Sequence, residues 1–129
     1  MISAAIFDLD DDGDLDIVTN EMNDQPMVLV SDLSARRAVH FLKVKLVGAV
    51  SNRDGLGATV KIKANSRTWT QYHDGKSGYL SQSSIPLYFG LGDAPQADSV
   101  EVLWPSGRKQ TVTKDIPRNG LLTLRESTP

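Results

Sequence analysis

The residues best suited to chemistry lie in one acidic stretch near the N-terminus, which reads DLDDDGDLD over positions 8–16. Aspartates stand at every second position of this stretch, at Asp8, Asp10, Asp12, Asp14 and Asp16. Ca²⁺ prefers oxygen ligands, and a loop with alternating carboxylates and one glycine can curl those oxygens around a single ion. Without a cation, carboxylates crowded this closely would repel one another. The stretch therefore predicts a calcium site with these five aspartates as candidate ligands, Asp14 through its backbone carbonyl.

Three other interpretations of the acidic stretch compete with calcium binding. An EF-hand is rejected because Thr19 stands where that loop needs glutamate, and a β-branched strand sequence follows. IFDLD resembles the nucleophile motif of haloacid-dehalogenase-type phosphatases, with Asp8 as nucleophile and Asp10 as general acid. Asp12 stands where that family has threonine or valine, and the helical framework it needs is not visible in the sequence. A solvated acidic turn without an ion is the plainest alternative, and the spacing favours calcium over it.

The charge distribution divides the chain into two parts. Residues 1–32 contain nine acidic residues and no lysine or arginine, whereas the rest of the chain has all 14 basic residues and seven acidic ones. We expect a first part over residues 1–35 and a second over 36–129. The basic residues are scattered through short segments, which indicates a solvated β surface rather than a nucleic-acid partner.

Composition excludes several kinds of site. The chain has no cysteine and only two histidines, so disulfides, thiolate metal sites and multi-histidine zinc sites are excluded or disfavoured. No apolar run reaches the roughly 20 residues that cross a bilayer, so membrane insertion is not expected.

Alternation of apolar and polar residues dominates the pattern, and helical periodicity is confined to a short segment at 32–38. Glycine, proline or asparagine interrupts the chain about every ten residues, and WPSG at 104–107 is typical of a hairpin turn. The predicted fold is all-β: an antiparallel β-sandwich or barrel-like domain with an N-terminal calcium-loop β-hairpin. The expected strand segments are 3–8, 15–20, 26–32, 40–47, 59–65, 68–72, 86–89, 99–104, 110–113 and 121–126.

Two segments of the second part offer candidate ligand-binding residues. Asn52, Arg53 and Asp54 lie in a glycine-flanked loop that suits a sugar or peptide, although a turn closed by its own side chains is the more frequent arrangement. Trp69 and Tyr79 could stack on a glycan, although Tyr79 also suits a purely structural role. Trp104 continues an inward-facing row and is expected in the core. No G-x-S-x-G motif surrounds any serine, so hydrolysis is disfavoured.

Two stretches resemble known families. AAIFDLDDDGDLDIVTN resembles the calcium loop of an FG-GAP or VCBS repeat, the blade unit of integrin-type β-propellers. LKVKLVGAVSNRDGLGATVKIKA, SGYLSQSSIPLYFGLG and ADSVEVLWPSGRKQTV together resemble the ASPIC/UnbV domain over roughly residues 40–125. The resemblance implies an upstream FG-GAP propeller as partner and a secreted parent protein whose signal peptide precedes this segment. It brings no established catalytic chemistry.

Together these observations predict a non-enzymatic, extracellular, calcium-binding module, the C-terminal part of a secreted adhesion or surface-binding protein. Its expected partners are an extracellular protein or a polysaccharide. An accessory domain of a glycan-active enzyme and a purely structural propeller cap are the alternatives. The acidic residues are sparse after Asp32, which makes the carboxylate pair of a glycosidase hard to assemble.

Overall fold

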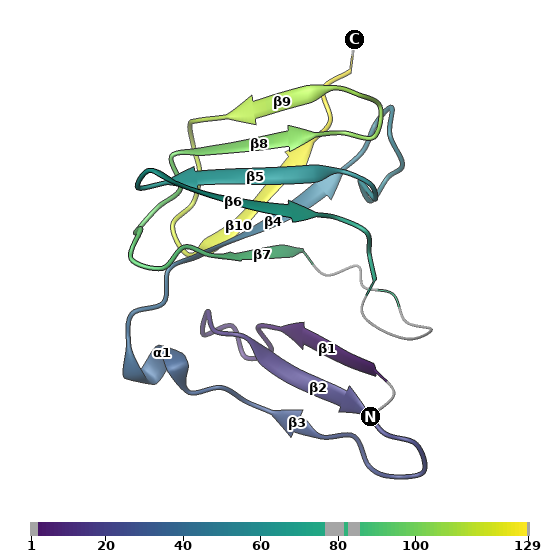
Figure 1. Ribbon diagram of the computed structural model, residues 1–129, viewed down its shortest axis with the longest axis vertical. Coiled ribbons are helices and arrows are strands. Elements are labelled where there is room, and N and C mark those ends of the chain that lie inside the picture. Colours follow the sequence, from purple (N-terminus) through teal and green to yellow (C-terminus); the bar gives the residue numbers. More distant parts are fainter. Residues whose placement is uncertain (1–2, 77–81, 83–85, 129) are drawn as a thin grey trace. The chain divides into compact units, whose positions relative to one another are not determined.

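The computed structural model describes residues 3–76, 82 and 86–128 (Figure 1). The chain forms two compact units, one of residues 1–39 with 75–85 and one of residues 40–74 with 86–129. Tyr79 lies outside the described residues. Within the described ranges, no helix has the length and apolar character needed to cross a membrane.

The first unit contains an antiparallel sheet in the order β1-β2-β3, which confirms the three strands expected there. Its strands are β1 (Ser3–Phe7), β2 (Asp16–Asn20) and β3 (Val28–Leu29). The helix α1 (Leu33–Arg36) follows, within the segment where a short helix was predicted. Phe7 pairs with Asp16 across the β1–β2 ladder, so the acidic stretch becomes the loop of this hairpin.

The second unit contains two open sheets, and the all-β prediction is confirmed. One sheet has the order β10-β4-β7 and the other β6-β5-β8-β9. The strands are β4 (Phe41–Val47), β5 (Thr59–Ala64), β6 (Arg67–Tyr72), β7 (Leu87–Gly90), β8 (Ser99–Leu103), β9 (Lys109–Val112) and β10 (Gly120–Arg125). In Figure 1 the strands β4 and β10 cross behind β5 and β8, as in a sandwich.

Period-two alternation explains how the two sheets of the sandwich pack. In β5, Val60 and Ile62 are fully buried, while Lys61 and Lys63 point to solvent on the opposite face. The core takes such alternate residues from both sheets, which is how a sandwich buries one face of each. Its members are Leu42, Val44, Leu46, Ala58, Val60, Ile62, Ala64, Phe89, Leu91, Ala94, Ala97, Val100, Val102, Trp104, Ile116 and Leu124.

One pairing within the sandwich is parallel. β10 runs parallel to β4, from Gly120 opposite Leu42 to Arg125 opposite Val47, whereas the other ladders of both sheets are antiparallel. Parallel neighbours need a long connection because the chain must return to the same end of the sheet. Here the connection from β4 to β10 consists of the intervening strands.

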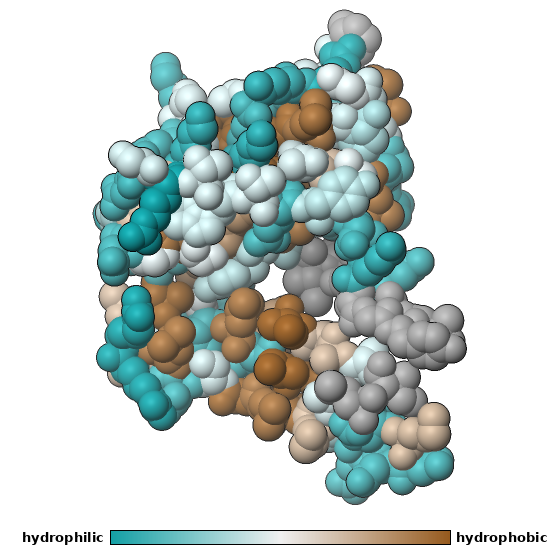
Figure 2. Space-filling view, viewed as in Figure 1, coloured by the Kyte–Doolittle hydropathy of each residue, from teal (hydrophilic) through white to brown (hydrophobic). Residues whose placement is uncertain are grey.

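The two units expose different kinds of surface. The first unit leaves apolar side chains exposed, among them Ile6, Val28, Leu29 and Val30, and Figure 2 shows apolar side chains gathered on it. The outer face of the four-stranded sheet in the second unit has mainly polar side chains, with Leu103 exposed among them. A shallow pocket on that face is lined by Lys61, Lys63, Thr68, Thr70, Ser99, Glu101, Lys109 and Thr111.

Candidate metal centre

The β1–β2 loop folds tightly because two of its residues adopt a left-handed backbone. Gly13 has φ 93° and Asp11 has φ 66°, conformations favoured by glycine and tolerated by aspartate. Gly13 is buried and Asp11 is exposed, so the loop curls inward at the glycine and turns Asp11 outward. The hairpin register brings Asp8 and Asp16 to the two ends of the loop.

Three carboxylates converge in this loop. Asp8, Asp10 and Asp16 each place one carboxylate oxygen within 4.8 Å of the other two. Asp16 is 1% exposed, Asp8 is partly buried and Asp10 is exposed, so the cluster spans the loop from its interior to its surface. A triad of this spacing could hold a metal ion.

Backbone N–H groups orient two members of the triad. Asp8 accepts hydrogen bonds from the N–H groups of Asp12 and Gly13, each at 3.1 Å. The two oxygens of Asp16 accept from the N–H groups of Leu9 and Ser31, both at 2.8 Å. These bonds hold the carboxylates in place and leave lone pairs available to a cation, since each carboxylate has about four acceptor sites.

The other two predicted ligands, Asp12 and Asp14, lie outside this triad. The carboxylate of Asp12 accepts from the N–H of Asp14 at 3.0 Å and from the Ser34 hydroxyl, and Asp14 Oδ2 accepts from the Ser34 N–H at 2.8 Å. Ser34 belongs to α1, so this helix is tied to the acidic loop. Asp14 is 2% exposed, and its Oδ1 is buried without a hydrogen-bond partner among the described residues.

The pKa shifts of the loop reflect this division. Loss of hydration, followed by the negative charges of Asp12 and Asp16, raises the pKa of Asp10 above its ordinary value. Hydrogen bonds from the Ser34 hydroxyl and the Asp14 N–H lower the pKa of Asp12. The carboxylate of Asp10 is thus disfavoured by lost hydration first and by its negative neighbours second, whereas that of Asp12 is stabilised by its donors.

The loop with Asn52, Arg53 and Asp54 is closed by its own side chains. Asn52 bonds Leu56 twice, accepting from its N–H at 2.8 Å and donating to its carbonyl at 2.7 Å. Arg53 and Asp54 form an exposed ion pair at 3.5 Å, with the Arg53 side chain 88% exposed. The side chain of Asn52 therefore serves the turn, and those of Arg53 and Asp54 remain on the surface.

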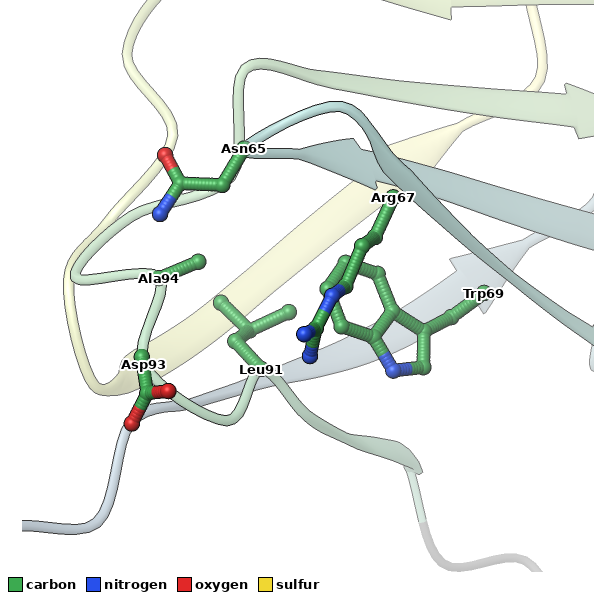
Figure 3. A pocket seen from close by; sticks show the side chains of 6 residues that line it. All are labelled: Asn65, Arg67, Trp69, Leu91, Asp93 and Ala94. Atoms are coloured by element: carbon green, nitrogen blue, oxygen red, sulfur yellow. The ribbon is translucent and has the colours of Figure 1, made fainter.

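The two tryptophans occupy different environments. Trp104 is 1% exposed in the core and donates its indole N–H to Gln110 Oε1 at 3.1 Å, in agreement with its expected core position. Trp69, on β6, is partly buried and packs against the core, and it also lines a pocket of about 220 Å³ (Figure 3).

Sequence reasoning did not single out Glu126, although it occupies a built polar site. It is 4% exposed, and its Oε2 accepts from the N–H groups of Ala49, Val50 and Ser51 at 2.7–2.9 Å. Its Oε1 accepts from the hydroxyls of Ser51 and Ser106. Alternation is the signal that could have identified it, since Glu126 continues the inward row of Leu122 and Leu124.

Comparison with known proteins places the second unit in a family. A family model described as "ASPIC and UnbV" matches residues 48–129, well over half of the chain. No FG-GAP model matches the acidic segment, and no curated protein matches the chain. The match includes strands β5 to β10 and the residue 48–57 loop that Glu126 holds. On this basis the chain belongs to the ASPIC and UnbV family.

Proposed function

We propose that the protein is a non-enzymatic, extracellular, calcium-binding module of a secreted protein that binds a surface partner. Residues 1–35 would be part of an FG-GAP or VCBS repeat, and its loop would hold the Ca²⁺. The ASPIC/UnbV domain would follow an FG-GAP propeller in the parent protein and present the binding surface.

The observation that supports calcium is the combination of the triad with the buried oxygen of Asp14. Asp8, Asp10 and Asp16 bring hard oxygen ligands within 4.8 Å, which is the donor chemistry that Ca²⁺ prefers. Asp14 Oδ1 is a buried carboxylate oxygen without a donor among the described residues, and burying an uncompensated charge is costly. A cation in the same loop would lower that cost.

The acidic residues of the two pockets support a binding role for the second unit rather than a catalytic one. Glycoside hydrolysis needs two carboxyl groups across the scissile bond. Each of the two pockets described in the second unit has one acidic residue, Asp93 in one and Glu101 in the other. Glu101 also pairs with Lys109 at 3.2 Å.

A calcium titration of the ¹⁵N-labelled chain tests the metal centre. We expect the backbone signals of residues 8–16 to shift with a Kd of about 10⁻⁴–10⁻³ M, the range of extracellular calcium modules. D10N should weaken binding at least tenfold because it removes one charged ligand of the triad. D11N is the matched control, because Asp11 is an exposed neighbour outside the triad and asparagine tolerates its positive φ.

The result has clear contrary outcomes. Loop signals that do not move in several millimolar Ca²⁺, or a D10N variant that binds as tightly as D11N, would overturn the calcium assignment. The extracellular location is tested separately, by an antibody against the chain used on intact cells and on the culture medium.

A further inference from the structure

The pocket beside Trp69 brings together polar side chains that have no partner among the described residues. Asn65 comes from the β5–β6 turn, Arg67 and Trp69 come from β6, and Asp93 follows β7 (Figure 3). In the part of the chain that the structure describes, neither the side chains of Asn65, Arg67 and Asp93 nor the indole N–H of Trp69 has a hydrogen bond or ion pair. The guanidinium of Arg67 and the indole N–H of Trp69 are donors, the carboxylate of Asp93 is an acceptor, and the amide of Asn65 can do both.

Tight turns and backbone hydrogen bonds fix the positions of the two walls from which these side chains extend. Asn65 and Ser66 have φ 46° and 62°, as in the tight two-residue turn of a hairpin. On the other wall, Leu91 N–H donates to the His40 carbonyl at 2.8 Å and Ala94 N–H to the Leu91 carbonyl at 3.1 Å. Fixed walls reduce the entropy lost on binding.

The Arg67 side chain lies close to this second wall. A Cβ built on Gly92 would lie 3.8 Å from Arg67 Nη1, an ordinary van der Waals distance, so glycine is favoured there by its φ of +60° and not by lack of space. The guanidinium therefore lies beside the 91–94 turn and the Trp69 ring, and Figure 3 shows it directed into the space that Asp93 faces.

We propose that this pocket binds a hexuronic acid residue of an acidic polysaccharide. The guanidinium of Arg67 matches a carboxylate, which it can bind through two parallel hydrogen bonds. Asp93 and the amide of Asn65 suit sugar hydroxyls, and the apolar C–H face of a sugar ring can pack on the Trp69 indole. The volume of about 220 Å³ is below the usual 300–1,000 Å³ of pockets for drug-sized ligands, so it suits a single sugar ring.

The net charge of the second unit favours an acidic rather than a neutral glycan. This unit has 11 basic and seven acidic residues, so its field attracts polyanions. The inference deepens the surface-binding part of the proposed function by naming a site and a ligand class. It does not depend on calcium, because every residue lining the pocket belongs to the second unit.

The two indole N–H signals of the chain provide the test. In ¹H–¹⁵N spectra recorded with EDTA, glucuronate should shift the Trp69 indole signal saturably with a millimolar Kd, whereas the buried Trp104 signal stays fixed. Glucose differs from glucuronate only in carrying –CH₂OH for the carboxylate, and acetate supplies a carboxylate without the ring. Both should bind at least tenfold more weakly than glucuronate.

Variants assign the effect to the pocket. R67Q should weaken glucuronate binding at least tenfold, since a charge-assisted pair is lost. R125Q, which changes an exposed arginine on β10, should leave binding unchanged. An unchanged Trp104 indole signal shows that each variant is folded.

Three results would overturn the proposal: a Trp69 signal that glucuronate does not shift, equal shifts with glucose or acetate, or R67Q binding as wild type. The calcium assignment would stand in each case, because its readout is the signals of residues 8–16. If those signals ignore Ca²⁺ while Trp69 responds to glucuronate, the calcium assignment fails alone.

Discussion

Glu126 illustrates how a single buried charge can organise a loop far away in the sequence. Burial alone would raise its pKa, but hydrogen bonds from Ser106, Ser51 and Ala49 outweigh this and lower the pKa from 4.5 to about 2. A carboxylate with five donors is stable as an anion. The 49–51 backbone therefore depends on the ionised form of Glu126.

The first prediction concerns acid stability. A lowered folded-state pKa contributes stability that is present above the unfolded pKa near 4.5 and is lost as the pH falls toward 2. E126Q should lower the Tm at pH 7 by more than about 5 °C and flatten the decline below pH 4.5. Thermal melts monitored by circular dichroism between pH 7 and pH 2 measure both effects.

E101Q is the control for that prediction. Glu101 is only partly buried and forms a surface ion pair with Lys109, so the Tm of the E101Q variant should differ little from that of the wild type. Equal Tm values for E126Q and E101Q at pH 7 would show that the loop does not need the Glu126 charge.

At the scale of elements, the acidic hairpin and α1 form one structure through their hydrogen bonds. Ser34 of α1 bonds Asp12 and Asp14, and Ser31 bonds Asp16. A change in the charge of the loop should therefore alter the stability of residues 31–34 as well.

The second prediction follows from this connection. Removal of calcium by EDTA should speed amide hydrogen exchange in residues 8–20 and 31–34, because repulsion between carboxylates loosens the loop and its bonds to α1. Amides of β5 and β8 serve as the internal reference and should exchange at the same rate in Ca²⁺ and in EDTA. Amide exchange that speeds up equally along the whole chain, or does not change at all, would contradict the prediction.

The sequence pattern predicted the positions of the strands but not which strands pair with each other. Alternation at Leu42, Val44 and Leu46 predicts β4 and its buried face. It contains no signal for the parallel partner β10, because periodicity specifies which face is buried and not which strand lies alongside.

The site was predictable to a similar degree. Residue spacing identified the acidic loop, and the structure brings together Asp8, Asp10 and Asp16. Spacing alone could not show that Ser34, 20 residues beyond Asp14, bonds Asp12 and Asp14. Alternation places Arg67 and Trp69 on one face of β6, but Asp93 meets them only because the segment after β7 lies against this strand, which local patterns do not encode.

At the scale of the whole molecule, the two units have separate sources of stability. The core of the second unit consists of residues of that unit alone, from its two sheets and the loops between their strands. The described donors to Asp14 and Asp16 are Leu9, Ser31 and Ser34, all in the first unit. The proposed calcium site should therefore be insensitive to moderate destabilisation of the sandwich.

The third prediction tests that separation. Ile62 is fully buried on β5, so I62A should destabilise the sandwich by about 2–5 kcal/mol in urea unfolding followed by the fluorescence of Trp69 and Trp104, both in this unit. The calcium affinity of residues 8–16 in the folded protein should stay within twofold of wild type. A fall in affinity that tracks the loss of stability would show that the units unfold together.

The parallel pairing of β4 and β10 determines when their sheet can form during synthesis of the chain. β4 is the first strand of the sandwich to leave the ribosome and β10 the last, since Leu42 pairs with Gly120 and Val47 with Arg125. During translation β4 therefore keeps one edge unpaired until residues 120–125 have been synthesised. Contacts of such long sequence separation slow folding, so this nascent edge is where a chaperone would be needed most.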